Sequence, residues 1–279
     1  MAVNLRSVLA LTPGPVALGD HDPRDTPQAP GKKESTAQAT VGMGAELDGL
    51  QERLHVEGVH GGTRRILLVL QGMDTAGKGG VVSHVVGLVN PQGCRIASFK
   101  KPTTAELTHG FLWRIRRQLP PPGYLGVFDR SHYEDVLVAR VHRLAEVRTV
   151  ELRYGAINRF EARLAEAGTT VVKCFLHISP ERQAERLLAR LEDPTKHWKF
   201  NPGDIDERAH WKDYRRAYEI ALERCRSDEA PWYLVPSDRK WYRNWAVAQL
   251  LLETLRDLDP HYPPADYDVA AQRARLTDP

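Results

Sequence analysis

The residues with the clearest chemical potential run from Gly72 to Lys78, read GMDTAGK, and fit the pattern GxxxxGK. The aliphatic run RILLVL comes directly before them, and a helical stretch follows. In such a turn, glycines let backbone N–H groups face inward, and the lysine adds a mobile cation. This context favours a phosphate cradle over an ordinary glycine-rich turn with a surface lysine. Besides Lys78, the predicted phosphate contacts are Gly72, Met73, Thr75, Ala76, Gly77 and Gly79.

Gly79 stands where a P-loop usually has the Ser or Thr that ligates Mg²⁺. A magnesium ion would therefore need another ligand. Asp74 lies inside the predicted cradle, where phosphates would repel its carboxylate unless a divalent cation bridges them. Asp74 is the first predicted metal ligand; the alternative is an aspartate that turns outward and caps the loop.

A second polar cluster, FDRSHYED, follows another apolar stretch. Asp129 ends that stretch as a Walker B carboxylate would, close to the magnesium of a P-loop, and is the second predicted metal ligand. Arg130 is predicted to bind a phosphate through its planar guanidinium group. Tyr133 and Glu134 are further predicted substrate contacts. His132 could form a phosphohistidine, but P-loop enzymes normally transfer the phosphoryl group directly.

Basic side chains recur on a predicted helix at Arg182, Arg186 and Arg190, one every four residues. For Arg182 we favour a solvated helix face paired with neighbouring glutamates. Arg186 and Arg190 precede a polar loop, and we predict that they are lid arginines that close over the transferring phosphates.

Lys100 and Lys101 follow a predicted strand, and three arginines, at 114, 116 and 117, lie on the next predicted helix. Basic groups at several strand ends exceed what one nucleotide triphosphate needs, so they indicate a longer polyanion. Lys100 and Lys101 are accordingly predicted substrate contacts. Ordinary surface charge is the alternative for each of these residues.

The elements that must position these residues alternate along the chain. Predicted strands cover residues 65–70, 95–99, 124–128, 170–178 and 232–235. Predicted helices cover residues 44–57, 78–88, 104–119, 133–143, 147–167, 179–191, 208–226 and 241–258. This alternation predicts an α/β domain with a mostly parallel sheet covered on both faces, and a ligand site at the carboxyl ends of its strands.

The domain boundaries follow from composition. Residues 1–42 are rich in Pro, Gly, Ser and Thr without an apolar period, so we predict a disordered tail. Residues 43–267 are predicted to form one phosphotransferase domain with a lid at about 181–208, and residues 268–279 a C-terminal tail.

The bulk composition sets further limits on the 279-residue chain. Hydrophobic residues at 42% and charged residues at 27% are ordinary for a globular protein, and a net charge of +3 does not by itself indicate a nucleic-acid partner. No apolar run approaches the roughly 18 residues of a membrane-spanning helix, and no signal peptide is expected. Three widely spaced cysteines suit a reduced cytoplasm and give no metal-binding spacing.

Taken together, the motifs resemble those of the polyphosphate kinase 2 family over roughly residues 47–267. The resemblance rests on LQGMDTAGKGG, SFKKPT, FLWRIRRQLP, FDRSHYEDVLVARV, FLHISPERQAERLLARLEDPTKHWKFNPGDI and APWYLVPSDRKWYRNW. It implies a P-loop kinase fold similar to thymidylate kinase, with a helical lid. It also implies Mg²⁺ dependence, with Mn²⁺ as an alternative, and phosphorylation of nucleoside mono- or diphosphates by polyphosphate.

The resemblance assigns roles by motif position. Asp74 and Asp129 match the family's two essential aspartates, Lys78 its P-loop lysine, and Arg130 the arginine after the second aspartate. Arg186 and Arg190 match its basic lid residues. HYEDVLVARV and the PWYLVP and KWYRNW segments look closest to members that accept both AMP and ADP. Gly79 stands where many relatives have an acidic residue, and Asp129 where that subgroup often has Asn, which leaves nucleotide preference and metal number open.

These parts predict direct in-line transfer between polyphosphate and an adenine or guanine nucleotide, without a protein nucleophile. The alternatives are an ATP-dependent nucleotide kinase of the P-loop class and a non-catalytic nucleotide-binding module. Activity with polyphosphate as the sole donor would distinguish the polyphosphate-dependent enzyme from the ATP-dependent kinase. A homo-oligomer is expected, in which helices such as 241–258 could pack between subunits.

Overall fold

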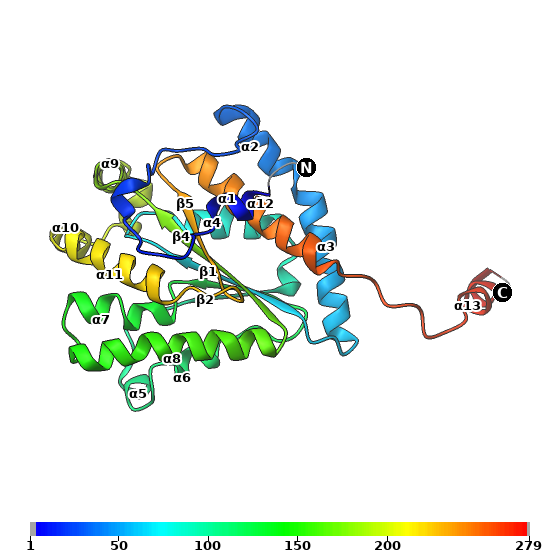
Figure 1. Cartoon of the computed structure of the whole chain (residues 1–279). Helices are drawn as coiled ribbons and strands as arrows, with labels where there is room; N and C mark the ends of the chain where they lie inside the picture. Colours follow the sequence, from blue (N-terminus) through cyan, green and yellow to red (C-terminus); the bar gives the residue numbers. More distant parts are fainter. Residues whose placement is uncertain (1–3, 278–279) are drawn as a thin grey trace.

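A five-stranded parallel sheet forms the centre of the computed structural model, which describes residues 4–277 (Figure 1). Its strands are β1 (Arg65–Gln71), β2 (Cys94–Ser98), β3 (Leu125–Asp129), β4 (Thr169–His177) and β5 (Trp232–Pro236). They lie in the order β2-β3-β1-β4-β5, and each neighbouring pair is parallel. The predicted α/β architecture is confirmed.

The central strand shows why the sequence folds this way. In β1, every side chain from Ile66 to Gln71 is buried. A continuous apolar run without alternation is typical of a parallel strand covered on both faces. Helices α3, α4 and α12 cover one face of the sheet, and α7 and α8 lie on the other (Figure 1).

The α-helices are more numerous than the sequence pattern predicts, and some of the predicted ones are shorter. The α-helices are α1 (Leu5–Leu9), α2 (Lys33–Gly42), α3 (Gly44–Val59), α4 (Lys78–His84), α5 (Thr104–Leu107), α6 (Trp113–Arg116), α7 (Val138–Val141), α8 (Val147–Glu166), α9 (Pro180–Glu192), α10 (Gly203–Ala209), α11 (Trp211–Arg224), α12 (Lys240–Leu258) and α13 (Val269–Thr277). Short 3₁₀ turns are η1 (Leu18–Asp20), η2 (Val86–Leu88), η3 (Pro91–Gly93), η4 (His132–Asp135) and η5 (Pro194–Lys199).

Three predicted helices are broken. The stretch 104–119 contains only α5 and α6, because a capping box at Thr103 and Glu106 starts a single turn that ends before Gly110. The stretch 133–143 is split into η4 and α7, and the helix after the P-loop ends at His84 before continuing as η2. Apolar residues at helical spacing are therefore present in these segments without a continuous helix.

The predicted disorder of residues 1–42 is wrong for the part that the structure describes. Residues 4–31, here called the N-terminal arm, and α2 pack on the domain. Leu5 and Leu9 are buried, and Ala10 forms an antiparallel bridge with Tyr233 of β5. An edge strand exposes unpaired backbone groups and apolar side chains, and the arm covers this edge with a few apolar residues too sparse to show a period.

Helix α12 belongs to the interior of its own chain. It packs against α2, α3 and α4, and most of its side chains are buried. This position does not fit the expectation that the helix packs between subunits. By contrast, α13 in the predicted C-terminal tail is a helix that lies apart from the rest of the chain (Figure 1). Within residues 4–277, no helix is long and apolar enough to cross a membrane.

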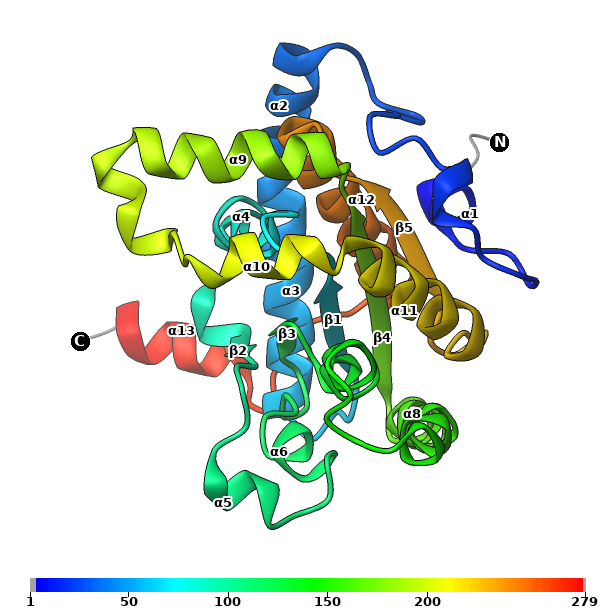
Figure 2. The same cartoon turned by 90° about the vertical axis from the view of Figure 1, so that its left-hand side faces the viewer.

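The carboxyl ends of β1, β3 and β4 meet at one edge of the sheet. Leu70 is in register with Asp129, and Gln71 with Phe175, so the polar residues that follow these strands come together. Helices α9 and α10, joined by η5, lie over this edge and correspond to the predicted lid (Figure 2).

Candidate functional site

The P-loop begins where β1 ends, and its backbone forms an open turn around Lys78. Gly72 and Gly77 have φ of 155° and 111°, values that favour glycine, and Thr75 adopts 62°. The Lys78 ammonium donates to the Gly72 carbonyl oxygen at 2.9 Å. Burial lowers the pKa of Lys78, while the nearby charges of Asp74 and Asp129 act in the opposite direction. The lysine is thus folded back over the loop with both aspartates close to it.

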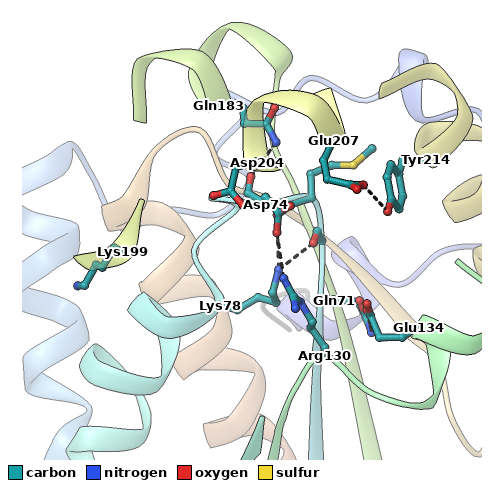
Figure 3. A network of polar contacts seen from close by, with 12 residues as sticks. Gln71, Asp74, Lys78, Arg130, Glu134, Gln183, Lys199, Asp204, Glu207 and Tyr214 are labelled. Atoms are coloured by element: carbon teal, nitrogen blue, oxygen red, sulfur yellow. Dashed lines mark hydrogen bonds and ion pairs between the residues drawn. The ribbon is translucent and has the colours of Figure 1, made fainter. Parts of the chain in front are cut away.

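Asp74 faces Arg130 across the mouth of this loop. The Arg130 Nη2 donates to Asp74 Oδ1 at 3.1 Å, and both side chains are about one-third exposed, at 39% and 30% (Figure 3). Although burial opposes it, Glu134, Asp74 and Asp129 raise the pKa of Arg130, which therefore stays charged. Its φ of 63° is a strained value for a non-glycine residue. Strain at Thr75 and at Arg130 marks both sides of one site.

The Asp74 and Asp129 carboxylates fit a magnesium ion only if substrate phosphates provide further ligands. Among residues 4–277 there is no group of three or more His, Cys, Asp or Glu side chains arranged to hold a metal ion. Mg²⁺ is commonly held by one or two carboxylates together with waters and substrate phosphates. Asp74 and Asp129, both close to the Lys78 ammonium, match that kind of site.

Three further acidic residues, Glu134, Asp204 and Glu207, lie around the Asp74 and Arg130 side chains (Figure 3). The sequence did not indicate that they form an acidic cluster. Glu134 accepts a hydrogen bond from Gln71 Nε2 at 3.2 Å, and burial raises its pKa. Asp204 of α10 also has a raised pKa, because of burial and then the Asp74 charge. Glu207, one helical turn further on, accepts from the Tyr214 hydroxyl at 2.7 Å. This concentration of negative charge would favour binding of cations at the mouth of the P-loop.

The lid arginines do not face the loop mouth as predicted. Arg186 is buried, and its guanidinium donates to four main-chain carbonyls, two of them in the P-loop. Arg190 donates to the Lys199 carbonyl at 2.9 Å and lies 3.4 Å from Asp204 Oδ2. In this conformation both arginines bind protein groups. The sequence spacing correctly placed them on α9 but could not show which way each side chain points.

Tyr133 is not positioned to contact substrate. It is fully buried, and its hydroxyl donates to Glu161 Oε1 at 2.8 Å. His132 is also fully buried, with Nε2 3.0 Å from the same carboxylate oxygen. Its burial disfavours the phosphohistidine alternative. These residues belong to a core network rather than to the cradle.

The other predicted basic contacts divide into exposed and buried groups. Lys100 and Lys101 are exposed just after β2. Arg114, in contrast, is buried, lies 3.7 Å from Asp135 and stacks near the Phe99 ring. Arg116 and Arg117 are exposed but lie over aromatic rings. The two lysines are therefore the better candidates for binding a long anion.

Two further residues contact the P-loop and were missed in the sequence. Gln183 Nε2 donates to the Asp74 carbonyl at 3.0 Å, and Arg243 Nη1 donates to the Ala76 carbonyl at 3.1 Å. Gln183 lies on α9 and Arg243 on α12, both far from the loop in sequence. Gly79, predicted as a phosphate contact, has open space where a side chain would extend.

Comparison with known proteins gives a consistent relationship. The family model for polyphosphate kinase 2 matches residues 31–263. An AMP/ADP-polyphosphate phosphotransferase of Meiothermus ruber is 45% identical over 250 residues, covering 90% of this chain and 92% of the relative. An ADP-polyphosphate phosphotransferase of Rhodopseudomonas palustris is 43% identical over 229 residues, covering 78% of each protein.

The solved structures agree. The crystal structure of polyphosphate kinase 2 from Arthrobacter aurescens is 50% identical to this chain and superposes with a TM-score of 0.97, covering 100% of this chain and 98% of that one. A polyphosphate kinase 2 structure described as putative, from Pseudomonas aeruginosa, is 29% identical with a TM-score of 0.74, covering 92% of this chain and 51% of that one. The chain belongs to the polyphosphate kinase 2 family.

Proposed function

We propose that this protein transfers the terminal phosphoryl group of inorganic polyphosphate to nucleoside mono- and diphosphates, converting AMP to ADP and ADP to ATP. The main structural support for this activity is that the P-loop, Asp74, Asp129 and Arg130 lie together at the carboxyl edge of the sheet. Membership of the polyphosphate kinase 2 family, and a relative named for acting on both AMP and ADP, support the choice of donor and acceptors.

The proposed mechanism assigns each residue a task. Lys78 and Arg130 bind phosphate oxygens and balance charge on the transferring group. Asp74 and Asp129 would hold Mg²⁺, or Mn²⁺ in its place, and the metal would supply further charge neutralisation. An acceptor phosphate oxygen would attack in line, so no protein nucleophile is needed. For Arg190 to reach a phosphate, it would have to leave Asp204, as a closing lid would allow.

The direct experiment supplies AMP, ADP, GMP or GDP with polyphosphate and Mg²⁺, without ATP, and identifies the products. The expected products from the adenine nucleotides are ADP and ATP, and the guanine nucleotides are expected to act as further acceptors. Transfer from ATP but not from polyphosphate would instead support the ATP-dependent nucleotide kinase.

The exposed lysines after β2 give a prediction about donor length. Replacing Lys100 and Lys101 by Gln is expected to raise the KM for long polyphosphate by about 3- to 10-fold, because each cation contributes to binding a polyanion. The KM for the nucleotide should change little, and the salt dependence of polyphosphate affinity should flatten.

Replacing the adjacent exposed residues Lys32 and Lys33 by Gln provides the matched control, since this change removes the same charge at the start of α2. Equal changes in both KM values would mean that Lys100 and Lys101 hold the nucleotide or the fold. If the Lys100 and Lys101 variant had the same KM for polyphosphate as the control variant, the two lysines would be ordinary surface charges.

The isolated C-terminal helix supports the expected homo-oligomer. In α13, Leu276 is 88% exposed and Val269 is 59% exposed, so both ends of this helix carry an apolar side chain that a partner subunit would cover. Removing residues 264–279 is expected to lower the mass measured by light scattering to that of a smaller assembly. An unchanged mass would show that α13 does not join subunits.

A further inference from the structure

Two buried arginines donate hydrogen bonds to main-chain carbonyl oxygens of the P-loop. Arg186 comes from α9 and is 9% exposed, and Arg243 comes from α12 and is 2% exposed. They are called the arginine pair below. Neither is close to the P-loop in sequence, so only the fold brings them there.

Arg186 ties the P-loop to the segment after β5. Its Nη1 donates to the carbonyl oxygens of Thr75 at 2.7 Å and Ala76 at 3.1 Å. Its Nη2 donates to those of Ser237 at 2.6 Å and Asp238 at 3.0 Å. A planar guanidinium with four such acceptors has little rotational freedom.

Arg243 reaches the same point from the opposite helix. Its Nη1 donates to the Ala76 carbonyl at 3.1 Å, so this oxygen accepts from both arginines. The guanidinium also fills the space beside two glycines: a methyl group at Gly77 would overlap Nη1, and one at Gly80 would lie 2.6 Å from Nη2. Glycine at both positions therefore permits the close approach of Arg243.

These contacts set the direction of one peptide in the cradle. The peptide between Ala76 and Gly77 is planar and trans, so its C=O and N–H point in opposite directions. Because the arginine pair holds the Ala76 oxygen, the Gly77 N–H is directed to the opposite side of the loop. Inward-facing N–H groups of this kind are what a glycine-rich loop offers to phosphate oxygens.

The pair also brings positive charge to the loop. Its hydrogen-bond acceptors are uncharged, namely main-chain carbonyls and the Asn244 side-chain oxygen. Burial lowers the pKa of Arg186 to about 10 and, together with the Arg186 charge, that of Arg243 to about 9, so both are protonated at neutral pH. The Asp238 carboxylate offsets part of the Arg186 charge, whereas the pKa of Arg243 is shifted by burial and Arg186 alone, so the pair leaves a positive potential that an anion would relieve.

We propose that Arg186 and Arg243 are positioning residues of the phosphate cradle, which orient the Ala76–Gly77 peptide and supply positive potential behind it for a phosphoanhydride chain. This inference rests on the proposed function, because it explains how the same site binds its phosphates. It replaces the predicted role of Arg186 as a lid arginine.

The test compares Arg243→Gln and Arg243→Lys in the full chain. Inorganic tripolyphosphate is the probe, its Kd is measured by calorimetry, and the melting temperature, kcat and KM are recorded in parallel. Arg243→Gln is expected to raise the Kd by about tenfold or more, the loss typical of one charge-assisted contact. Arg243→Lys keeps the charge and should recover part of that affinity.

Arg256→Gln is the matched control, because Arg256 lies on the same helix but pairs with Glu46 at the surface. It should leave the Kd unchanged. If Arg243→Gln lowers the melting temperature but binds tripolyphosphate with the wild-type Kd, the arginine is only structural and the proposal is overturned.

Gly80→Ala tests the same idea without removing a charged group, and serves if Arg243→Gln does not fold. Alanine favours a helix over glycine, so folding should persist while the new methyl displaces the Arg243 guanidinium. The substitution should raise the Kd for tripolyphosphate in the wild-type background, and an unchanged Kd in the folded variant would contradict the proposal. Where Arg243→Gln folds, Gly80→Ala should weaken binding much less in that background. Additive effects in the double variant would contradict the coupling.

The binding assay also separates this proposal from the proposed function. A wild-type protein that binds tripolyphosphate tightly but transfers no phosphate from polyphosphate would refute the activity and leave the arginine pair intact. If the enzyme is active but its Kd for tripolyphosphate is unchanged by Arg243→Gln and by Gly80→Ala, only the proposed role of the arginine pair is refuted.

Discussion

Asp74→Asn and Asp129→Asn are each expected to lower kcat by about 1,000-fold or more, because a catalytic metal contributes several kcal/mol of charge stabilisation in the transition state. Asparagine keeps the shape of the side chain but removes the charge that would hold Mg²⁺. The loss should appear in kcat with polyphosphate and ADP, measured over a Mg²⁺ titration.

The two aspartates differ in one further contact. Asp74 forms an ion pair with Arg130 at 3.1 Å, which Asp74→Asn would reduce to a neutral hydrogen bond, whereas the described residues show no such ion pair for Asp129. Asp228→Asn, an exposed change in the loop before β5, is the control and should retain wild-type turnover. Near wild-type turnover of either active-site variant at saturating Mg²⁺ would remove that residue from the metal site.

Lys173→Met is expected to destabilise the fold by about 3 to 5 kcal/mol, because it leaves a buried carboxylate without its cation. Lys173 is fully buried, and its ammonium donates to Glu161 Oε2 at 2.6 Å, to the Tyr133 hydroxyl at 2.9 Å and to the Cys225 carbonyl at 2.7 Å. Chemical denaturation would measure the change. Arg182→Gln, which breaks a surface pair with Glu185, should cost less than about 0.5 kcal/mol.

The same network predicts how stability depends on pH. Burial alone would raise the pKa of Glu161, but Lys173 and His132 hold it below its ordinary value of 4.5. The carboxylate therefore contributes stability that is present above pH 4.5 and is lost as the pH falls through the lower pKa of the folded state.

A Glu161→Gln variant should lose less stability on acidification than the wild type does. The double variant with Lys173→Met should cost less than the sum of the two single changes. Additive costs, or an unchanged acid profile, would show that this buried network does not act as a unit.

The broken helices and the N-terminal arm show what local pattern cannot resolve. Leu107 and Ile115 stand at helical spacing, yet Leu107 is 69% exposed and a bend separates the two short helices. The arm lacks a period because its few apolar residues fill separate positions on a surface built by other segments, such as the β5 edge. Periodicity reports a continuous face, so it misses both cases.

By itself, the sequence determined the P-loop, the parallel sheet and the placement of Asp74, Asp129 and Arg130 at one edge. These features depend on near neighbours: an apolar run makes the strand, the residues that follow it end at the same edge, and glycines shape the turn. Only the tertiary structure decided which side chains face the cradle.

The arginines of α9 illustrate the physical reason. Residues four apart on a helix rotate by about 40°, so a repeat every four residues drifts from one face to another. Arg182 accordingly pairs at the surface, Arg186 is buried against the P-loop, and Arg190 binds Asp204. Which of these faces meets the loop depends on how α9 packs against segments distant in sequence, as does the approach of Arg243 from α12.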